Sequence, residues 1–124
     1  MAPENSPTVQ VVLNFPELLE RLENDRELLV DLLEIFKEEC PSLLRALQEA
    51  VSGEDMNAVE RTGHTLKGMF ATLSASRAAS AALQLEQMGR NDEKSRLRDA
   101  LTVLESEVNA LLVELDTCLE ATHK

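Results

Sequence analysis

Aromatic residues and positive charge are both scarce in this sequence, and each shortage limits what the chain can bind. The chain has three Phe and no Tyr or Trp, and its 12 Lys and Arg stand against 23 Asp and Glu, for a formal net charge of −11. Nucleic-acid surfaces need basic side chains for the phosphates and aromatic platforms for the bases. The composition therefore predicts a protein that does not bind nucleic acid.

Cysteines and long apolar runs are scarce as well. Cys40 and Cys118 are too far apart in sequence for a CxxC pair or a zinc motif, so we expect two reduced core residues. No apolar run approaches the ~20 residues of a membrane span. The first residues lack the basic and apolar regions of a signal peptide. We therefore expect a cytoplasmic location without membrane contact, either alone or as the cytoplasmic part of a larger membrane-bound protein.

What the sequence does contain is a set of amphipathic helical patterns. Leu and Ala lead a composition that is 44% hydrophobic, with only four Gly and four Pro, and no stretch shows the two-residue alternation of a strand. Pro41 interrupts one long apolar stripe without changing its phase, which favours a kink over two separate helices. Five helices are predicted, each after an N-cap residue: Asn14, Asp25, Asp55, Ser76 and Asp92. The fold class is all-α, an antiparallel four-helix bundle with a short additional N-terminal helix.

The same patterns give domain boundaries. We predict a flexible N-terminal tail or linker over residues 1–13, one helical bundle over 14–120 and a C-terminal tail over 121–124. The third helix is expected to end near Ser74. Gly53, just after the second helix, is expected to take the C′ position.

His64 stands out in the third predicted helix. At 100° per residue it falls almost opposite Leu66, Val59 and Phe70, which share the apolar face. It is therefore predicted to be exposed and not a core histidine. Gly68 follows one turn later and costs about 1 kcal/mol relative to Ala in a helix interior. We expect close approach of another molecule to offset that cost, the alternative being contact with a neighbouring helix of the bundle.

Other residues extend this surface. Lys67 lies three positions after His64, where its ammonium group can hold an anion at the imidazole. Small side chains continue outward from the histidine, at Ala71 and then Ala75. The sequence from Arg61 to Leu85 contains no Asp or Glu, although an even spread would place about four or five there. Such an acid-free stretch suits a phosphoryl group, which carries about two negative charges.

A neutral imidazole nitrogen can attack phosphorus and form a phosphoramidate. The chain has no P-loop and no GxGxxG motif, because its only glycines are Gly53, Gly63, Gly68 and Gly89. It is therefore predicted to carry a phosphoryl group without generating one, and not to be an enzyme with a kinase centre of its own. A di-iron bundle enzyme is rejected, since it needs Glu-x-x-His motifs on two helices.

The run His64-Thr65-Leu66-Lys67-Gly68 resembles the H-x-L-K-G signature of histidine-containing phosphotransfer (HPt) domains. The likeness extends from about Phe15 to Leu115 and includes the run at 32–41, Leu85-Glu86 and Gly89-Arg90. Family members often have Asn and Gly where this chain has Thr72 and Ser74. The pattern of the second helix is similar to modules of hybrid sensor kinases.

The resemblance implies that His64 accepts a phosphoryl group from the aspartyl phosphate of one receiver domain and passes it to another. It implies that Lys67 steadies the phosphoryl group and that Gly68 lets the receiver approach. The implied partners are response-regulator receiver domains and a sensor histidine kinase in cis. No cofactor or metal is expected in this chain, because Mg²⁺ belongs to the receiver. The expected partner-contacting residues are Arg61, Thr65, Gly68, Ala71 and Ala75.

Two alternatives stay open at this point. Residues 64–72 also resemble the phosphorylated domain of chemotaxis-type kinases, in which a separate kinase domain is the donor. A helical interaction module that has lost phosphotransfer is the other alternative, and the intact His64, Lys67 and Gly68 argue against it.

Overall fold

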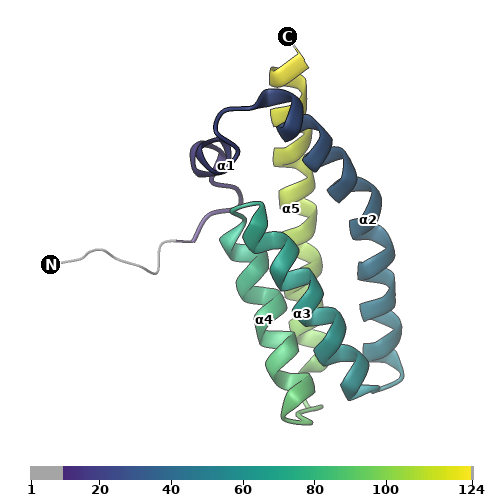
Figure 1. Cartoon of the computed structure of the whole chain (residues 1–124). Helices are drawn as coiled ribbons and strands as arrows, with labels where there is room; N and C mark the ends of the chain where they lie inside the picture. Colours follow the sequence, from purple (N-terminus) through teal and green to yellow (C-terminus); the bar gives the residue numbers. More distant parts are fainter. Residues whose placement is uncertain (1–9, 124) are drawn as a thin grey trace, which may run out of the picture.

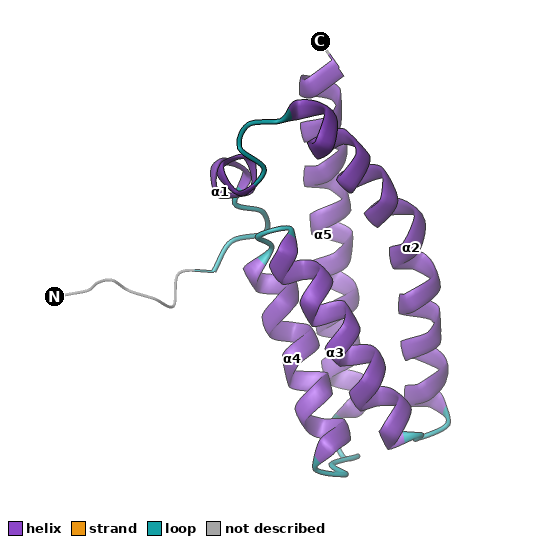
Figure 2. Cartoon of the chain, in the orientation of Figure 1, coloured by secondary structure: helices purple, strands orange, loops and turns teal. Residues whose placement is uncertain are grey.

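A computed structural model gives the backbone of residues 10–123 and the side chains of residues 10–121. Within that part the chain forms five helices and no strand: α1 (Phe15–Arg21), α2 (Arg26–Ser52), α3 (Met56–Thr72), α4 (Ser76–Arg90) and α5 (Leu97–His123). Helices α2 to α5 run antiparallel in chain order, and the short α1 lies near one end of the bundle (Figures 1 and 2). The predicted all-α bundle is confirmed.

Three of the predicted helix starts are confirmed by their capping hydrogen bonds. The side-chain oxygens of Asn14, Asp25 and Asp55 accept from backbone N–H groups three residues on, at 3.0–3.2 Å. Each bond satisfies one of the amide donors that a helix leaves without a partner in its first turn. These caps fix the starts of α1, α2 and α3.

The other two predicted caps are wrong. Ser76 is the first residue of α4, and its hydroxyl accepts from the Val11 N–H at 2.9 Å in place of capping the helix. Asp92 has a positive φ of 54° and belongs to the turn after α4, while α5 begins only at Leu97. Both errors have one cause, because the short polar side chains that cap helices also suit turns and hydrogen bonds to other backbone groups.

The hydrophobic core lies between the four long helices. Helix α2 is continuous through Pro41, so it is not divided in two, and it contributes Leu33, Phe36 and Cys40 to the core. Burial raises the pKa of the Cys40 thiol to about 11, so that cysteine stays a protonated core residue, as predicted. Phe36 meets Phe70 of α3 edge to face, with ring centroids 5.9 Å apart. This contact anchors the last turn of α3 against α2.

Helices α3 and α4 approach each other most closely, at two glycines. A Cβ atom on Gly89 would lie 2.6 Å from the backbone nitrogen of Glu60 and 2.8 Å from the backbone oxygen of Met56. A Cβ atom on Gly63 would lie 3.0 Å from the backbone nitrogen of Glu86. Side chains are therefore absent where the two backbones meet, and the crossing of the two helices is fixed.

The turns of this protein use left-handed backbone at residues other than glycine. Ser74, between α3 and α4, has φ of 59°, and Glu54, after α2, has φ of 53°. Gly53 keeps a right-handed φ of −88°, so the predicted C′ role belongs to Glu54 instead. Helix α3 accordingly ends at Thr72, two residues before the predicted Ser74.

The predicted terminal boundaries also differ from the structure. Residues 1–9 of the predicted tail lie outside the described part of the chain. Residues 11–13 are not a free tail, because Val11 exchanges hydrogen bonds with Ser76 and Arg77 of α4 while Val12 and Leu13 pack against the core. At the other end α5 continues to His123, within the stretch 121–124 that was predicted as a tail. None of the described helices is long and apolar enough to cross a membrane.

Candidate functional site

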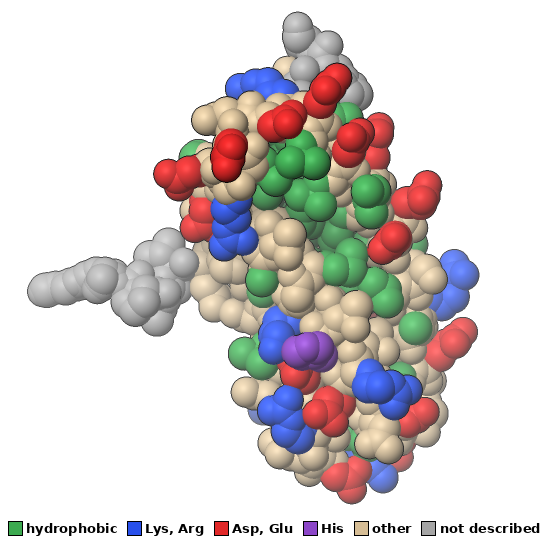
Figure 3. Space-filling view, viewed as in Figure 1, with side chains coloured by type: hydrophobic (Ala, Val, Ile, Leu, Met, Phe, Trp, Pro, Cys, Tyr) green, Lys and Arg blue, Asp and Glu red, His purple; other side chains and the backbone are tan. Residues whose placement is uncertain are grey.

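His64 lies on the outer face of α3, as the helical periodicity predicts. Its side chain is 66% exposed, whereas Leu66 and Phe70 of the same helix are fully buried. Figure 3 shows the imidazole on an open face of the bundle, with hydrophobic side chains gathered over α2 and beside α1 on that face. The ring is therefore open to a second molecule.

Gly68 faces open space one turn after His64. A Cβ atom built on Gly68 would meet no atom within 4 Å outside its own helix backbone. The alternative explanation, contact with a neighbouring helix, is thereby excluded. The fold does not require glycine at this position, so its cost to the helix needs another explanation.

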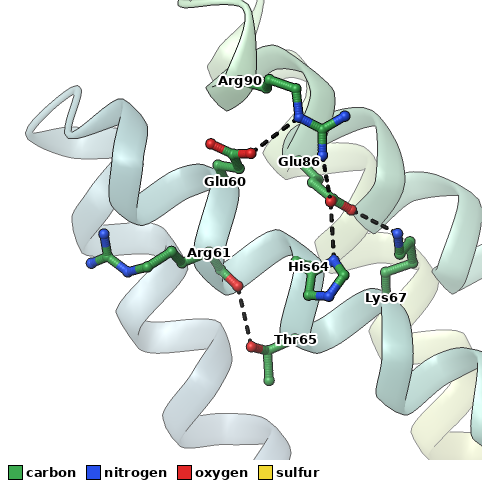
Figure 4. Close-up of polar contacts among 7 residues, drawn as sticks. All are labelled: Glu60, Arg61, His64, Thr65, Lys67, Glu86 and Arg90. Atoms are coloured by element: carbon green, nitrogen blue, oxygen red, sulfur yellow. Dashed lines mark hydrogen bonds and ion pairs between the residues drawn. The ribbon is translucent and has the colours of Figure 1, made fainter.

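A buried carboxylate lies directly behind the imidazole. Glu86 of α4 has a side chain only 4% exposed, and its Oε2 lies 3.0 Å from Nδ1 of His64. Its Oε1 lies 2.9 Å from Nζ of Lys67 (Figure 4). Arg90 of α4 also reaches Oε2, at 2.9 Å, and its Nε lies 3.1 Å from Oε2 of Glu60 on α3. The Glu86 carboxylate therefore contacts three basic side chains, those of His64, Lys67 and Arg90.

The glycine contacts of α3 and α4 explain how Glu86 reaches this place. Gly63 precedes His64 directly, and the backbone of Glu86 passes where a Gly63 side chain would lie. The carboxylate is therefore held at hydrogen-bonding distance from the ring by two helix backbones and not by a loop. Such support keeps the His64–Glu86 geometry constant.

Glu86 is ionised, which decides the tautomer of His64. The hydrogen bond from Lys67 lowers the pKa of Glu86 most, burial acts against it, and the bond from His64 lowers the pKa further. A carboxylate can only accept hydrogen bonds, so Nδ1 of the neutral ring must carry the proton. The lone pair then lies on Nε2, and the imidazole can act as a nucleophile through that nitrogen.

Most of the other predicted partner-contacting residues are exposed around His64. Arg61, Thr65 and Ala71 are all exposed on α3, and the Thr65 hydroxyl donates to the Arg61 carbonyl at 3.1 Å. Ala75 is fully buried, so the prediction for this residue is wrong. The helical projection assumed that α3 continues to residue 75, but the chain reverses at Ser74.

The acid-free stretch of the sequence does not mean that the site is free of negative charge. It holds along the sequence from residue 61 to 85, yet Glu86 and Glu60 flank it and both line the hollow in front of the imidazole. Negative charge is therefore present at the site, in paired form. Sequence reasoning assigned no role to Glu86, although the residue belongs to the Leu85-Glu86 pair within the resemblance.

The site offers a nucleophile and cations. Over the described residues, no group of three or more His, Cys, Asp or Glu side chains is placed to hold a metal ion. The chemistry that this arrangement supports is nucleophilic attack by Nε2 on an electrophile brought by a second molecule.

Comparisons with known proteins agree with this geometry. A protein-family model described as Hpt domain matches residues 31–122. The fold is similar to the crystal structure of histidine-containing phosphotransfer protein B (HptB) from Pseudomonas aeruginosa PAO1, with a TM-score of 0.83 and 22% sequence identity over 94% of this chain and 98% of that one. A search of curated proteins found no match.

Proposed function

This chain belongs to the Hpt domain family and is a phosphorelay intermediate, and on that premise we propose that His64 is the residue that carries the phosphoryl group. One observation supports this choice above all. His64 presents an exposed ring whose Nδ1 is occupied by the buried carboxylate of Glu86, which leaves the Nε2 lone pair directed outward. An Hpt domain is a phosphocarrier and not an enzyme.

The transfer itself is an in-line displacement at phosphorus. Nε2 of His64 attacks the phosphorus of an aspartyl phosphate, the N–P bond forms, and the electron pair of the broken P–O bond leaves with the aspartate carboxylate. The second transfer reverses these roles on another aspartate. Lys67 supports the phosphoryl group by its charge, since its ammonium lies beside the ring on the Glu86 carboxylate. We assign no cofactor to this chain and place Mg²⁺ in the receiver.

Response-regulator receiver domains are the partners of an Hpt domain. We propose that they dock on the face around His64, over Gly68, Ala71, Thr65 and Arg61. The open space at Gly68 supports this assignment, because a partner can lie against the α3 backbone there. The hydrophobic side chains on the same face add apolar area to that contact (Figure 3). We also propose a cytoplasmic location for this chain, alone or as the cytoplasmic part of a membrane-bound hybrid sensor kinase, which would then be the source of the phosphoryl group in cis.

Transfer from a labelled receiver tests this proposal. A receiver domain is phosphorylated with labelled acetyl phosphate, freed of excess donor and mixed with the protein. The unchanged protein is expected to gain a label that is labile in acid and stable in base. His64→Gln is expected to gain none. His123→Gln, which changes the only other histidine of the sequence, is the matched control and keeps the label.

Two results contradict the proposal. One is equal labelling of His64→Gln and of the unchanged protein, which would place the phosphoryl group on another residue. The other is the absence of label from every candidate receiver of the source organism, which would remove the relay function from this site.

A further inference from the structure

The second nitrogen of the His64 ring has a consequence for how the phosphoryl group leaves. Nδ1 donates to Oε2 of Glu86 at 3.0 Å, and that carboxylate is almost entirely shielded from water. A buried charge that is paired acts through a lower dielectric than an exposed one, so its influence on a contacting group is stronger. Glu86 therefore acts on Nδ1 both before and after Nε2 is phosphorylated.

Phosphorylation changes the charge of the ring. When Nε2 uses its lone pair to bind phosphorus while Nδ1 keeps its proton, the ring becomes a cation. When the phosphoryl group leaves, the N–P electron pair returns to Nε2 and the leaving group is neutral imidazole. If Nδ1 loses its proton first, the same bond cleavage must release an imidazolate anion, which is a far more basic and poorer leaving group. The proton on Nδ1 thus decides whether the phosphohistidine can donate.

We propose that Glu86 is a positioning residue that holds the proton on Nδ1 of phosphorylated His64, so that the domain keeps donating to receivers at neutral and mildly alkaline pH. The inference rests on His64 being the phosphorylated residue. It concerns the onward step, because in the loading step the same Nδ1 hydrogen bond only keeps the Nε2 lone pair free for attack.

The other charged groups near the ring are not placed to hold the proton on Nδ1. The hollow in front of His64 is lined by Glu60 and Arg61 of α3 and by Glu86 and Arg90 of α4, and no side chain of α2 or α5 in the described part of the chain lines it. Lys67 and Arg90 lie against the carboxylate oxygens of Glu86. The carboxylate of Glu60 pairs with Arg90 at 3.1 Å. Direct contact with Nδ1 belongs to Glu86.

The pH profile of donation tests the proposal. The protein and Glu86→Gln are loaded with phosphoramidate, which phosphorylates histidine directly, and transfer to one receiver is timed from pH 6.5 to 9. The rate ratio of the two proteins cancels the pH dependence of the receiver. An opposite charge within 4–6 Å shifts a titration by about 1–3 pH units. The variant is therefore expected to match the unchanged protein within about twofold at pH 6.5 and to fall about tenfold behind it by pH 9.

A second readout follows the proton itself. In ¹⁵N-labelled phosphoprotein, the Nδ1 resonance of His64 is expected to titrate at least about one pH unit higher in the unchanged protein than in Glu86→Gln. A residue with a merely structural role would not move this midpoint. Glu60→Gln removes the neighbouring carboxylate without touching the Nδ1 hydrogen bond, and it is the matched control for local charge.

The outcomes separate this inference from the proposed function. Equal Nδ1 midpoints in the unchanged protein and Glu86→Gln overturn the inference and leave His64 as the carrier. An equal shift in Glu60→Gln and Glu86→Gln also overturns it, because the general field would then be the cause. If Glu86→Gln does not fold, an Nδ1 midpoint in the unchanged phosphoprotein no higher than in a phosphohistidine peptide overturns it. Failure of phosphoramidate to load His64 of the unchanged protein contradicts the proposed function as well.

Discussion

Two glycines of α3, Gly63 and Gly68, are five residues apart and have opposite surroundings. Gly63 is buried against α4, where an added Cβ would lie 3.0–3.2 Å from the backbone of Glu86 and Ala82. Gly68 faces open space. Both reduce the intrinsic stability of the helix by about 1 kcal/mol relative to Ala. The fold accounts for the first glycine, and the proposed docking of a receiver would account for the second.

The comparison shows how packing and function divide one helix. Gly63 serves the site indirectly, because it lets the α4 backbone bring Glu86 to the ring of His64. Gly68 serves it directly, because it leaves room in front of the helix. Substitutions at the two kinds of glycine should therefore affect different measurements, stability in one case and transfer in the other.

The largest expected effect is on transfer, in Gly68→Glu. A glutamate on the docking face adds bulk and a like charge to the incoming phosphoryl group, and we expect receiver-to-His64 transfer to fall about a hundredfold or more. The thermal midpoint should not fall, because Glu is a better helix former than Gly. Gly68→Ala is the companion variant for stability and should gain about 0.5–1 kcal/mol. Unchanged transfer in Gly68→Glu would remove the reason offered for this glycine.

The next effect is on stability, in Gly89→Ala. The new Cβ would lie 2.6 Å from the backbone of Glu60, so α3 and α4 must separate. Overpacking of this kind costs about 1–3 kcal/mol, against a gain of about 1 kcal/mol from helix propensity. Because the clash is with backbone, we place the cost at the upper end of that range and expect a net loss of about 2 kcal/mol in the free energy of unfolding, measured in urea. A gain instead would show that the two helices adapt easily and would weaken the contrast with Gly68.

A smaller change in the free energy of unfolding, this time a gain, is expected in Ser74→Gly. Ser74 has φ of 59°, and its Oγ is buried without a hydrogen-bond partner. Glycine tolerates this backbone and removes the unpaired hydroxyl, so the variant should be more stable by about 1 kcal/mol. Ser106→Gly, within α5 and exposed, is the matched control and should lose about 0.5 kcal/mol. Destabilisation in Ser74→Gly would mean that its side chain has a role that the turn geometry does not explain.

Much of the fold could be predicted because local rules decide it. The caps at Asn14, Asp25 and Asp55 and the continuity of α2 through Pro41 follow from residue type and periodicity. The predicted caps at Ser76 and Asp92 are wrong because such residues also suit turns and hydrogen bonds to distant backbone groups, and only the tertiary structure decides between these uses. Membership of the Hpt family confirms the function that the His64 signature predicts.

The site was predicted in part, and the reason lies in what periodicity can measure. A helical projection places His64 and Gly68 on the outer face of their own helix, and the structure agrees. It gives no information on which face of α4 meets α3, so Glu86, 22 residues later, received no role. The contact of Gly63 with the Glu86 backbone decides that question. A buried glycine next to the histidine was the available signal.

The backbone contact between α3 and α4 also affects what docking costs. Association requires the partners to lose conformational freedom, and each loop or side chain that must be immobilised weakens the complex. At Gly63 and Gly89 the two helices touch without side chains between them, so they have little room to slide. The face that carries His64 is already ordered before a receiver arrives. In the proposed docking, little ordering of the α3–α4 backbone is left to weaken the complex, so the same surface can serve successive receivers.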